Sequence, residues 1–191
     1  MTAQPAPPVG LNHLVINVRD IEESHRFWTE VVGLKLVGEL RRAPERPNTP
    51  QMRFYSGLRG GELHHHDIAL RENKKLPPSP APGWNDSMPS AIGHVAIAFP
   101  SREVWLDRLA YLQARGVKFD RRVEHGMTHS LYIYDPNGYS VELLYELPRE
   151  VWEGDIERAL NHYVALPTEG QEALQDRADV PVFKARHPAE I

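Results

Sequence analysis

The chain has 191 residues, of which 41% are hydrophobic and 25% charged, and its formal net charge is −4. These are the values of an ordinary globular protein, and a mildly acidic balance gives no reason to expect binding to nucleic acid or to an anionic membrane. Cysteine is absent, which excludes disulfides and thiolate ligands, so any metal would need nitrogen and oxygen donors. No apolar run could span a bilayer and no secretory signal opens the chain, so we expect a cytoplasmic protein with no membrane partner.

The first elements that the sequence predicts are a strand and a helix. Residues 11–18 are apolar and partly β-branched, which predicts a buried strand with His13 as its third residue. Asp20 and Glu23 have the spacing of a capping box, and the apolar residues that follow have helical spacing. Gly33 ends this helix.

Two further strands and a connector complete the first half. Residues 52–56 and 63–70 have strand composition and are separated by glycines. The stretch 76–90 is rich in proline, which predicts a connector that is neither strand nor helix. Residues 1–10 are also rich in proline and predict a flexible N-terminal segment.

The second half repeats the first. Residues 92–99 follow the pattern of 11–18 and again have a histidine, His94, in third place. Ser101 begins a second helix, which ends at Gly116. Two more strands, residues 130–134 and 140–145, flank a strong reverse-turn signal at residues 135–138. Beyond the repeat, residues 148–191 predict an extension with a helix from Asp155 to about Val164.

This repeat predicts an α+β fold of two tandem βαβββ modules. The first module spans residues 11–75 and the second spans 91–147, with the connector 76–90 between them. One such module leaves a sheet face exposed. We therefore expect the two modules to pair by pseudo-twofold symmetry into an open mixed-sheet barrel around a metal site.

Three residues form the predicted metal site. His13 and His94 occupy equivalent places in the two modules, and Glu142 lies on the last strand of the second. Two neutral imidazoles and one carboxylate leave open coordination positions and suit Fe(II) best, with Mn(II) as an alternative and Zn(II) less specifically.

These features resemble the vicinal-oxygen-chelate superfamily, which includes glyoxalase I, bleomycin-resistance proteins and type I extradiol dioxygenases. The resemblance covers residues 9–147 and rests on His13, His94 and the closing segment Asp135-Pro-Asn-Gly-Tyr-Ser-Val-Glu142. It implies the paired-module fold and a divalent metal.

Three local motifs are similar to those of one-domain extradiol dioxygenases. The segment His65-His66-Asp67-Ile68-Ala69-Leu70 implies that His66 is the acid-base residue, although the run from His64 leaves its register open. Tyr132 matches a tyrosine that hydrogen-bonds the substrate, and His125 in Glu124-His125-Gly126 matches a histidine beside the oxygen site. The resemblance thus implies Fe(II)-dependent ring opening of a catechol-type diol with O2, in the breakdown of aromatic compounds.

Two alternatives stay open at this point. A glyoxalase- or epimerase-like lyase or isomerase would use His66 as a fourth ligand. A metal-free protein of the bleomycin-resistance type would only sequester its ligand and would not need His13, His94 and Glu142 together. The sequence does not decide which diol is the substrate or whether the chain forms a homo-oligomer.

Overall fold

A computed structural model describes residues 11–40, 50–63, 65–77, 92–177 and 180–184 of the chain. The fold divides into two compact units, Met1–Ser79 and Pro80–Ile191. The predicted N-terminal segment 1–10, His64 and residues 78–91 of the predicted connector lie outside the described residues.

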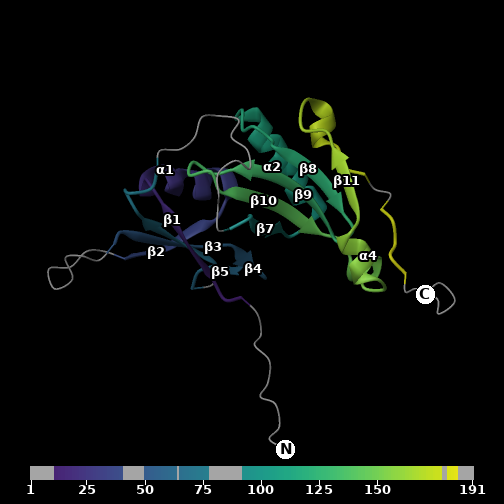
Figure 1. Cartoon of the computed structure of the whole chain (residues 1–191), viewed down its shortest axis with the longest axis horizontal. Helices are drawn as coiled ribbons and strands as arrows, with labels where there is room; N and C mark the ends of the chain where they lie inside the picture. The colour runs from purple at the N-terminus through teal and green to yellow at the C-terminus, as the bar shows by residue number, and fades with distance from the viewer. Residues whose placement is uncertain (1–10, 41–49, 64, 78–91, 178–179, 185–191) are drawn as a thin grey trace, which may run out of the picture. The chain divides into compact units, whose positions relative to one another are not determined.

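The first unit contains a four-stranded mixed sheet (Figure 1). The strand order is β1-β6-β3-β2, with β1 and β6 parallel and the other neighbours antiparallel. A short hairpin, β4 with β5, lies outside this sheet. The elements are β1 (Leu14–Val18), α1 (Ile21–Arg26), η1 (Phe27–Val32), β2 (Lys35–Leu40), β3 (Met52–Ser56), β4 (Leu58–Arg59), β5 (Glu62–Leu63) and β6 (Ile68–Glu72).

The helix of the first unit begins and ends as the sequence predicts. The Asp20 side chain accepts hydrogen bonds from the backbone N–H groups of Glu22 and Glu23, which caps α1. The helix continues as the π-helical turn η1 and ends at Gly33, whose φ of 96° is left-handed. Trp28 on this turn is fully buried.

The second unit has the same topology and one additional strand. Its order is β11-β8-β9-β10-β7, with β7 and β10 parallel and the other neighbours antiparallel. The α+β fold with two βαβββ modules is therefore confirmed. The elements are β7 (Val95–Phe99), α2 (Arg102–Ala114), β8 (Arg121–His125), β9 (Thr128–Tyr134), β10 (Ser140–Glu146), α3 (Arg149–Trp152), α4 (Ile156–Leu160), β11 (Tyr163–Leu166) and η2 (Gln171–Leu174).

Helix α2 covers one face of the second unit's sheet. Its residues Trp105, Leu109 and Leu112 are fully buried, and the Trp105 indole donates a hydrogen bond to the Leu143 carbonyl at 2.8 Å. The Trp105 ring also packs against the Tyr145 ring, with centroids 5.3 Å apart, so the Tyr145 side chain lies on the α2 face, and side chains an odd number of residues away on the strand point to the other face. Glu142 is therefore on the face that α2 does not cover.

The predicted helix from Asp155 to about Val164 is wrong beyond Leu160. Tyr163–Leu166 is strand β11, which pairs with β8 in antiparallel register. The physical reason is that β8 is the outer strand of its module, and its unpaired backbone groups accept a further strand.

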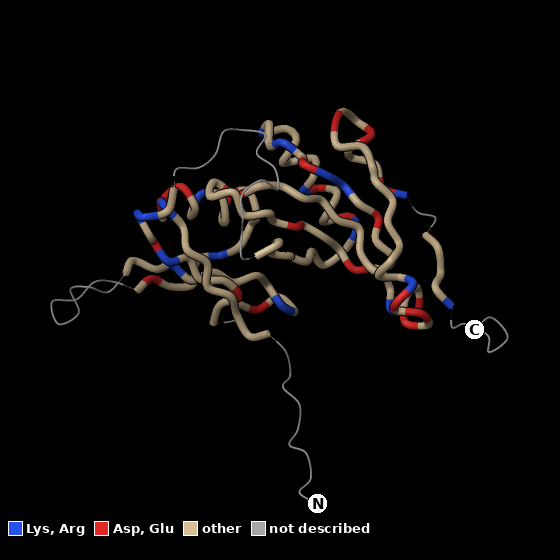
Figure 2. The backbone as a smooth tube through the Cα atoms, viewed as in Figure 1, with Lys and Arg blue, Asp and Glu red and all other residues tan. Residues whose placement is uncertain are grey.

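Charged residues are spread along both units. Figure 2 shows acidic and basic positions interspersed along the backbone of each.

In the described part of the chain no helix is both long and apolar enough to cross a membrane.

Candidate metal centre

Two of the three predicted ligands are in contact in the second unit. His94 directly precedes β7, and Glu142 lies on β10 as the parallel partner of Ala96. His94 Nε2 is 3.0 Å from Glu142 Oε2. The Glu142 side chain is only 7% exposed, so its charge is buried beside the imidazole.

This pair has the spacing of two ligands of one metal ion. Two donors that each lie about 2.1 Å from a metal and subtend a right angle are about 3 Å apart. The second oxygen of Glu142, Oε1, accepts a 2.8 Å hydrogen bond from the Tyr132 hydroxyl. That bond fixes the carboxylate so that Oε2 alone is directed at His94, which is how supporting hydrogen bonds orient a metal ligand.

Tyr132 connects Glu142 to His125. Tyr132 is the direct antiparallel partner of Glu142, as the turn between them predicts, and its hydroxyl is 3.2 Å from His125 Nε2. Burial raises the pKa of the Tyr132 hydroxyl, and the hydrogen bond to Glu142 raises it further, so this group stays protonated and can donate. Burial lowers the pKa of His125, although the Glu142 carboxylate and a hydrogen bond to the backbone of His162 raise it.

The first unit brings His13 close to His66. His13 directly precedes β1, and its Nδ1 is 2.7 Å from the Asn12 side-chain oxygen. The ring centroids of His13 and His66 are 4.4 Å apart, and Nδ1 of His66 is 3.0 Å from Nδ1 of His65. Burial lowers the pKa of His66, and His13 and His65 lower it further, which favours a neutral ring.

The predicted strand over residues 63–70 is wrong in its middle. Strand β5 ends at Leu63 and β6 begins at Ile68, so His65 and His66 lie in an irregular segment. The register within this histidine run therefore cannot be decided by the alternation of side chains along a strand. The break is stabilised at Asp67, whose carboxylate accepts a hydrogen bond from the Gly57 N–H and pairs with Arg59.

The complete set of His13, His94 and Glu142 remains a prediction. His13 belongs to the first unit and the other two belong to the second. Among the residues that the structure describes, no three His, Asp or Glu side chains are grouped so as to hold a metal ion. The pair in the second unit fits a metal by its spacing and its donor chemistry.

The sequence predicted no role for Arg121, which contacts Tyr132, or for His162, which contacts the neighbour of His125. The Arg121 guanidinium lies 4.2 Å from the centroid of the Tyr132 ring, and His162 lies 3.1 Å from the buried Glu124. Arg121 could have been found by counting alternate residues back along β8 from His125. His162 had no local signal, because its partner is 38 residues away.

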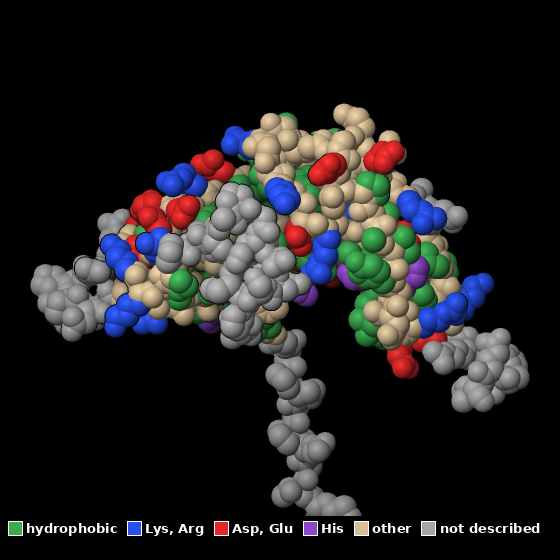
Figure 3. Space-filling view, turned by 45° about the horizontal axis from the view of Figure 1, so that its top comes forward, with side chains coloured by type: hydrophobic (Ala, Val, Ile, Leu, Met, Phe, Trp, Pro, Cys, Tyr) green, Lys and Arg blue, Asp and Glu red, His purple; other side chains and the backbone are tan. Residues whose placement is uncertain are grey.

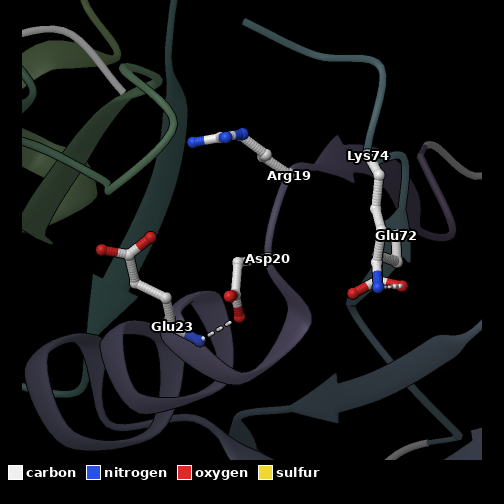
Figure 4. A pocket seen from close by; sticks show the side chains of 5 residues that line it. All are labelled: Arg19, Asp20, Glu23, Glu72 and Lys74. Carbon is white, nitrogen blue, oxygen red and sulfur yellow. Dashed lines mark hydrogen bonds and ion pairs between the residues drawn. The ribbon is translucent and has the colours of Figure 1, made fainter. Parts of the chain in front are cut away.

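A separate open hollow in the first unit is lined only by charged side chains (Figure 4). Two of its carboxylates make contacts within the first unit: Asp20 caps α1, and Glu72 is 3.8 Å from Lys74. None of the predicted site residues lines it. Its lining residues are Arg19, Asp20, Glu23, Glu72 and Lys74.

The chain thus has a repeated βαβββ module and, in its second unit, a His94–Glu142 ion pair whose two groups can both donate to a metal. The profile of the Glyoxalase/Bleomycin resistance protein/Dioxygenase superfamily matches residues 10–143. The chain belongs to this superfamily.

Curated relatives within this superfamily have two different activities. The chain is 29% identical to a lactoylglutathione lyase of Schizosaccharomyces pombe over 70% of this chain and 46% of that protein. It is equally identical, 29%, to biphenyl-2,3-diol 1,2-dioxygenase 3 of Rhodococcus globerulus over 70% of this chain and 61% of that protein. This chain thus spans about half to three fifths of the length of these two relatives. A lactoylglutathione lyase of Pseudomonas putida matches at 27% over 93% of its length.

Solved structures agree with the fold. The glyoxylase/bleomycin resistance protein/dioxygenase domain from Frankia sp. EAN1pec is similar with a TM-score of 0.53 and 21% identity, over 74% of this chain and 94% of that domain. The fosfomycin resistance protein FosX of Listeria monocytogenes, solved with Mn(II) and sulfate, gives a TM-score of 0.50 and 17% identity, over 75% of this chain and 98% of that one. These structures share the fold of the chain, and the curated relatives described above are two lactoylglutathione lyases and one dioxygenase.

Proposed function

We propose that this protein opens the ring of a catechol-type diol with O2, using Fe(II) held by His13, His94 and Glu142. The observation that carries this proposal is the identity of residue 69. In the second unit Ala96, the second residue of β7, pairs with Glu142. In the first unit Val15, the second residue of β1, pairs with Ala69. A symmetrical site with four ligands would need a donor at that place, and alanine has none, so a fourth ligand would have to come from another residue, such as His66.

Three ligands favour a reaction that needs several open positions at the metal. When bound, Fe(II) would supply those positions for both diol oxygens and for O2, together with the electrons that O2 chemistry requires. A site with four protein ligands would leave fewer positions for two substrates.

His66 has the properties of a general base for the diol. Its lowered pKa favours the neutral ring, which can accept a proton near neutral pH. Its Nδ1 contacts His65, which leaves Nε2 as the atom that would take the proton of a diol hydroxyl. A neutral ring with a free Nε2 suits the acid-base role, and in the lyase alternative the same atom would bind the metal.

Tyr132 and His125 would act on the substrate oxygens. The Tyr132 hydroxyl keeps its proton because its pKa is raised, so it can donate to an oxygen on which negative charge develops. His125 lies within hydrogen-bonding distance of that hydroxyl. The two residues form a donor group next to the proposed metal position.

The second candidate is a metal-dependent lyase or isomerase of the lactoylglutathione lyase kind. Two observations favour it: lactoylglutathione lyases recur among the relatives, and the His66 ring is close enough to His13 to serve as a fourth ligand. In that reaction His66 would bind the metal and would not act as a base.

Metal content and oxygen uptake distinguish these two candidates. Protein purified without oxygen is analysed for metals, loaded with Fe(II), and tested in an oxygen electrode with monocyclic and bicyclic catechols. Ring cleavage predicts near-stoichiometric iron, one O2 consumed per diol and a yellow product. No uptake with any catechol, together with turnover of a glutathione hemithioacetal by the zinc or nickel form, would replace this proposal with the lyase. Protein that holds no metal would instead support a ligand-sequestering role.

A further inference from the structure

Arg121 lies on the same sheet face as the proposed ligand Glu142. Arg121 on β8 is the register partner of Tyr132 on β9, and Tyr132 is the register partner of Glu142 on β10. Register partners on neighbouring strands direct their side chains to the same face. Neighbouring strands are about 4.8 Å apart, so the backbone of Arg121 is about 10 Å from that of Glu142, a distance that a long side chain can largely cover.

The Arg121 side chain is held against the Tyr132 ring. Its guanidinium carbon is 4.2 Å from the centroid of that ring. The hydroxyl of the same ring donates to Glu142 Oε1 at 2.8 Å, so Tyr132 contacts the cation with its ring and the proposed ligand with its oxygen. Because the ring already restrains the long arginine side chain, a ligand that binds it pays a smaller entropy cost.

The N–H groups of the Arg121 side chain are free to bind a ligand. The residue is exposed, and within the described part of the chain no carboxylate pairs with its guanidinium. The other two arginines on this unit's core differ: Arg102 pairs with the buried Asp176 at 2.9 Å, and the buried Arg122 donates to the Gln175 carbonyl at 3.0 Å. Those two stabilise the fold, whereas Arg121 presents a cation to the open face.

The surface beside Arg121 offers contacts for an aromatic ring. His125 lies on the same face, because it is four residues along β8, and its Nε2 is 3.2 Å from the Tyr132 hydroxyl. The Tyr163 ring is edge-on to the His125 ring, with centroids 6.0 Å apart, and Tyr163 is 60% exposed. Histidine and hydrophobic side chains are seen together on the surface of the second unit (Figure 3). A ligand on this face therefore meets aromatic side chains and a cation.

We propose that Arg121 determines specificity by binding a carboxylate on the substrate, so that the substrate is an aromatic diol with an acidic substituent. This inference rests on the proposed function, because it takes a diol as the substrate. A substituent that extends along the Tyr132 side chain toward β8 would meet the guanidinium. A guanidinium binds a carboxylate through two parallel N–H···O bonds, which an uncharged substituent cannot form.

Matched pairs of diols test this proposal. The acids 3,4-dihydroxybenzoate and 2,3-dihydroxybenzoate are compared with 4-methylcatechol and 3-methylcatechol, in which a methyl group replaces the carboxylate. In the iron-loaded wild type, kcat/KM should be higher for at least one acid than for its methyl analogue. The KM of that acid should rise with salt, because salt screens an exposed ion pair.

Substitution of Arg121 should affect the acid alone. Arg121→Gln should lower kcat/KM for the acid by about 10- to 100-fold, the range for hydrogen bonds to a charged group, and leave the methyl diol unchanged. Arg121→Lys keeps the charge without the paired donors and should give an intermediate value. Arg115→Gln is the matched control, since that guanidinium also stacks on a ring, Tyr111 at 4.8 Å, but on helix α2. It should keep the wild-type values for all four diols.

Binding supplies a measurement that does not depend on turnover. Calorimetry of the iron-loaded protein under nitrogen should show the same loss of affinity for the acid in Arg121→Gln. Equal losses for the acid and its methyl analogue would show that Arg121 only supports Tyr132, and would overturn the proposal. So would a wild type that binds neither acid better than its methyl analogue. Absence of oxygen uptake, with binding of the acid that still depends on Arg121, would refute ring cleavage and leave the role of Arg121 intact.

Discussion

Ala69 holds in the first unit the place that Glu142 holds in the second. Ala69 is the parallel partner of Val15, and Glu142 is the parallel partner of Ala96, the second residue of the equivalent strand. Paired residues lie on the same face of a sheet, and each first strand follows a histidine. The two modules therefore share their topology but differ in whether they offer a carboxylate to a metal.

Restoring the missing carboxylate should change the coordination. We expect Ala69→Glu to retain metal, to show a metal-dependent gain in thermal stability and to lose oxygen uptake, because a fourth ligand would fill an open position. Ala69 is fully buried, so the same carboxylate should destabilise the metal-free protein. Melting curves with and without EDTA measure this. Ala69→Leu is the control of similar bulk, and an equal metal response in both variants would count against a ligand at residue 69.

Removal of either paired ligand should release the metal. Glu142→Gln and His94→Ala each take away one of two donors that lie 3.0 Å apart, so we expect metal content to fall at least about 10-fold, as loss of a direct ligand does more than loss of a supporting group. Elemental analysis gives the result. Glu146→Gln, on the same strand but exposed, should keep its metal. Full metal in Glu142→Gln would place the ion elsewhere.

Replacement of His66 shows whether this residue acts as a general base or as a metal ligand. We expect His66→Phe to keep its iron and to lose turnover by about 10²–10⁴-fold, the usual contribution of a general acid or base. Iron content and kcat are measured on the same preparation, with His25→Phe as a control on α1. Loss of iron in His66→Phe would make this residue a fourth ligand and favour the lyase.

Asp135 should make the stability of the protein depend on pH. Burial raises the pKa of this carboxyl to about 6, against the hydrogen bonds from Asn137 and Tyr139 that lower it. The folded state then binds the proton more tightly than the unfolded state, so the free energy of unfolding should decrease as pH rises from about 4 to about 6, by at most about 3 kcal/mol.

Urea unfolding of the wild type and of Asp135→Asn over this pH range measures that change. The asparagine oxygen can still accept the backbone N–H groups of Asn137 and Tyr139, which Asp135 Oδ1 accepts now. The difference between the two proteins should shrink toward low pH, where the aspartate is also neutral. A constant difference would mean that Asp135 does not titrate there.

The local part of the site could be predicted from the sequence. The direct pairing of Tyr132 with Glu142 follows from a tight turn at residues 135–138, because a short turn fixes the register of both strands. The positions of His13 and His94 follow from the internal repeat, because the same pattern of apolar residues builds the same strand twice. The composition and the internal repeat of the sequence thus determined the two modules and their order along the chain. They also determined two of the three strands that position the proposed ligands.

Tertiary structure alone decided the rest. His65 and His66 look like part of a strand in the sequence, yet neither belongs to one, because strand pairing depends on which neighbouring backbone is free. The contact of Gly126 with Ala159, and the bond between Glu124 and His162, join segments more than 30 residues apart. Periodicity and turn signals act over a few residues, whereas such contacts depend on the edge that β8 leaves open in the folded sheet.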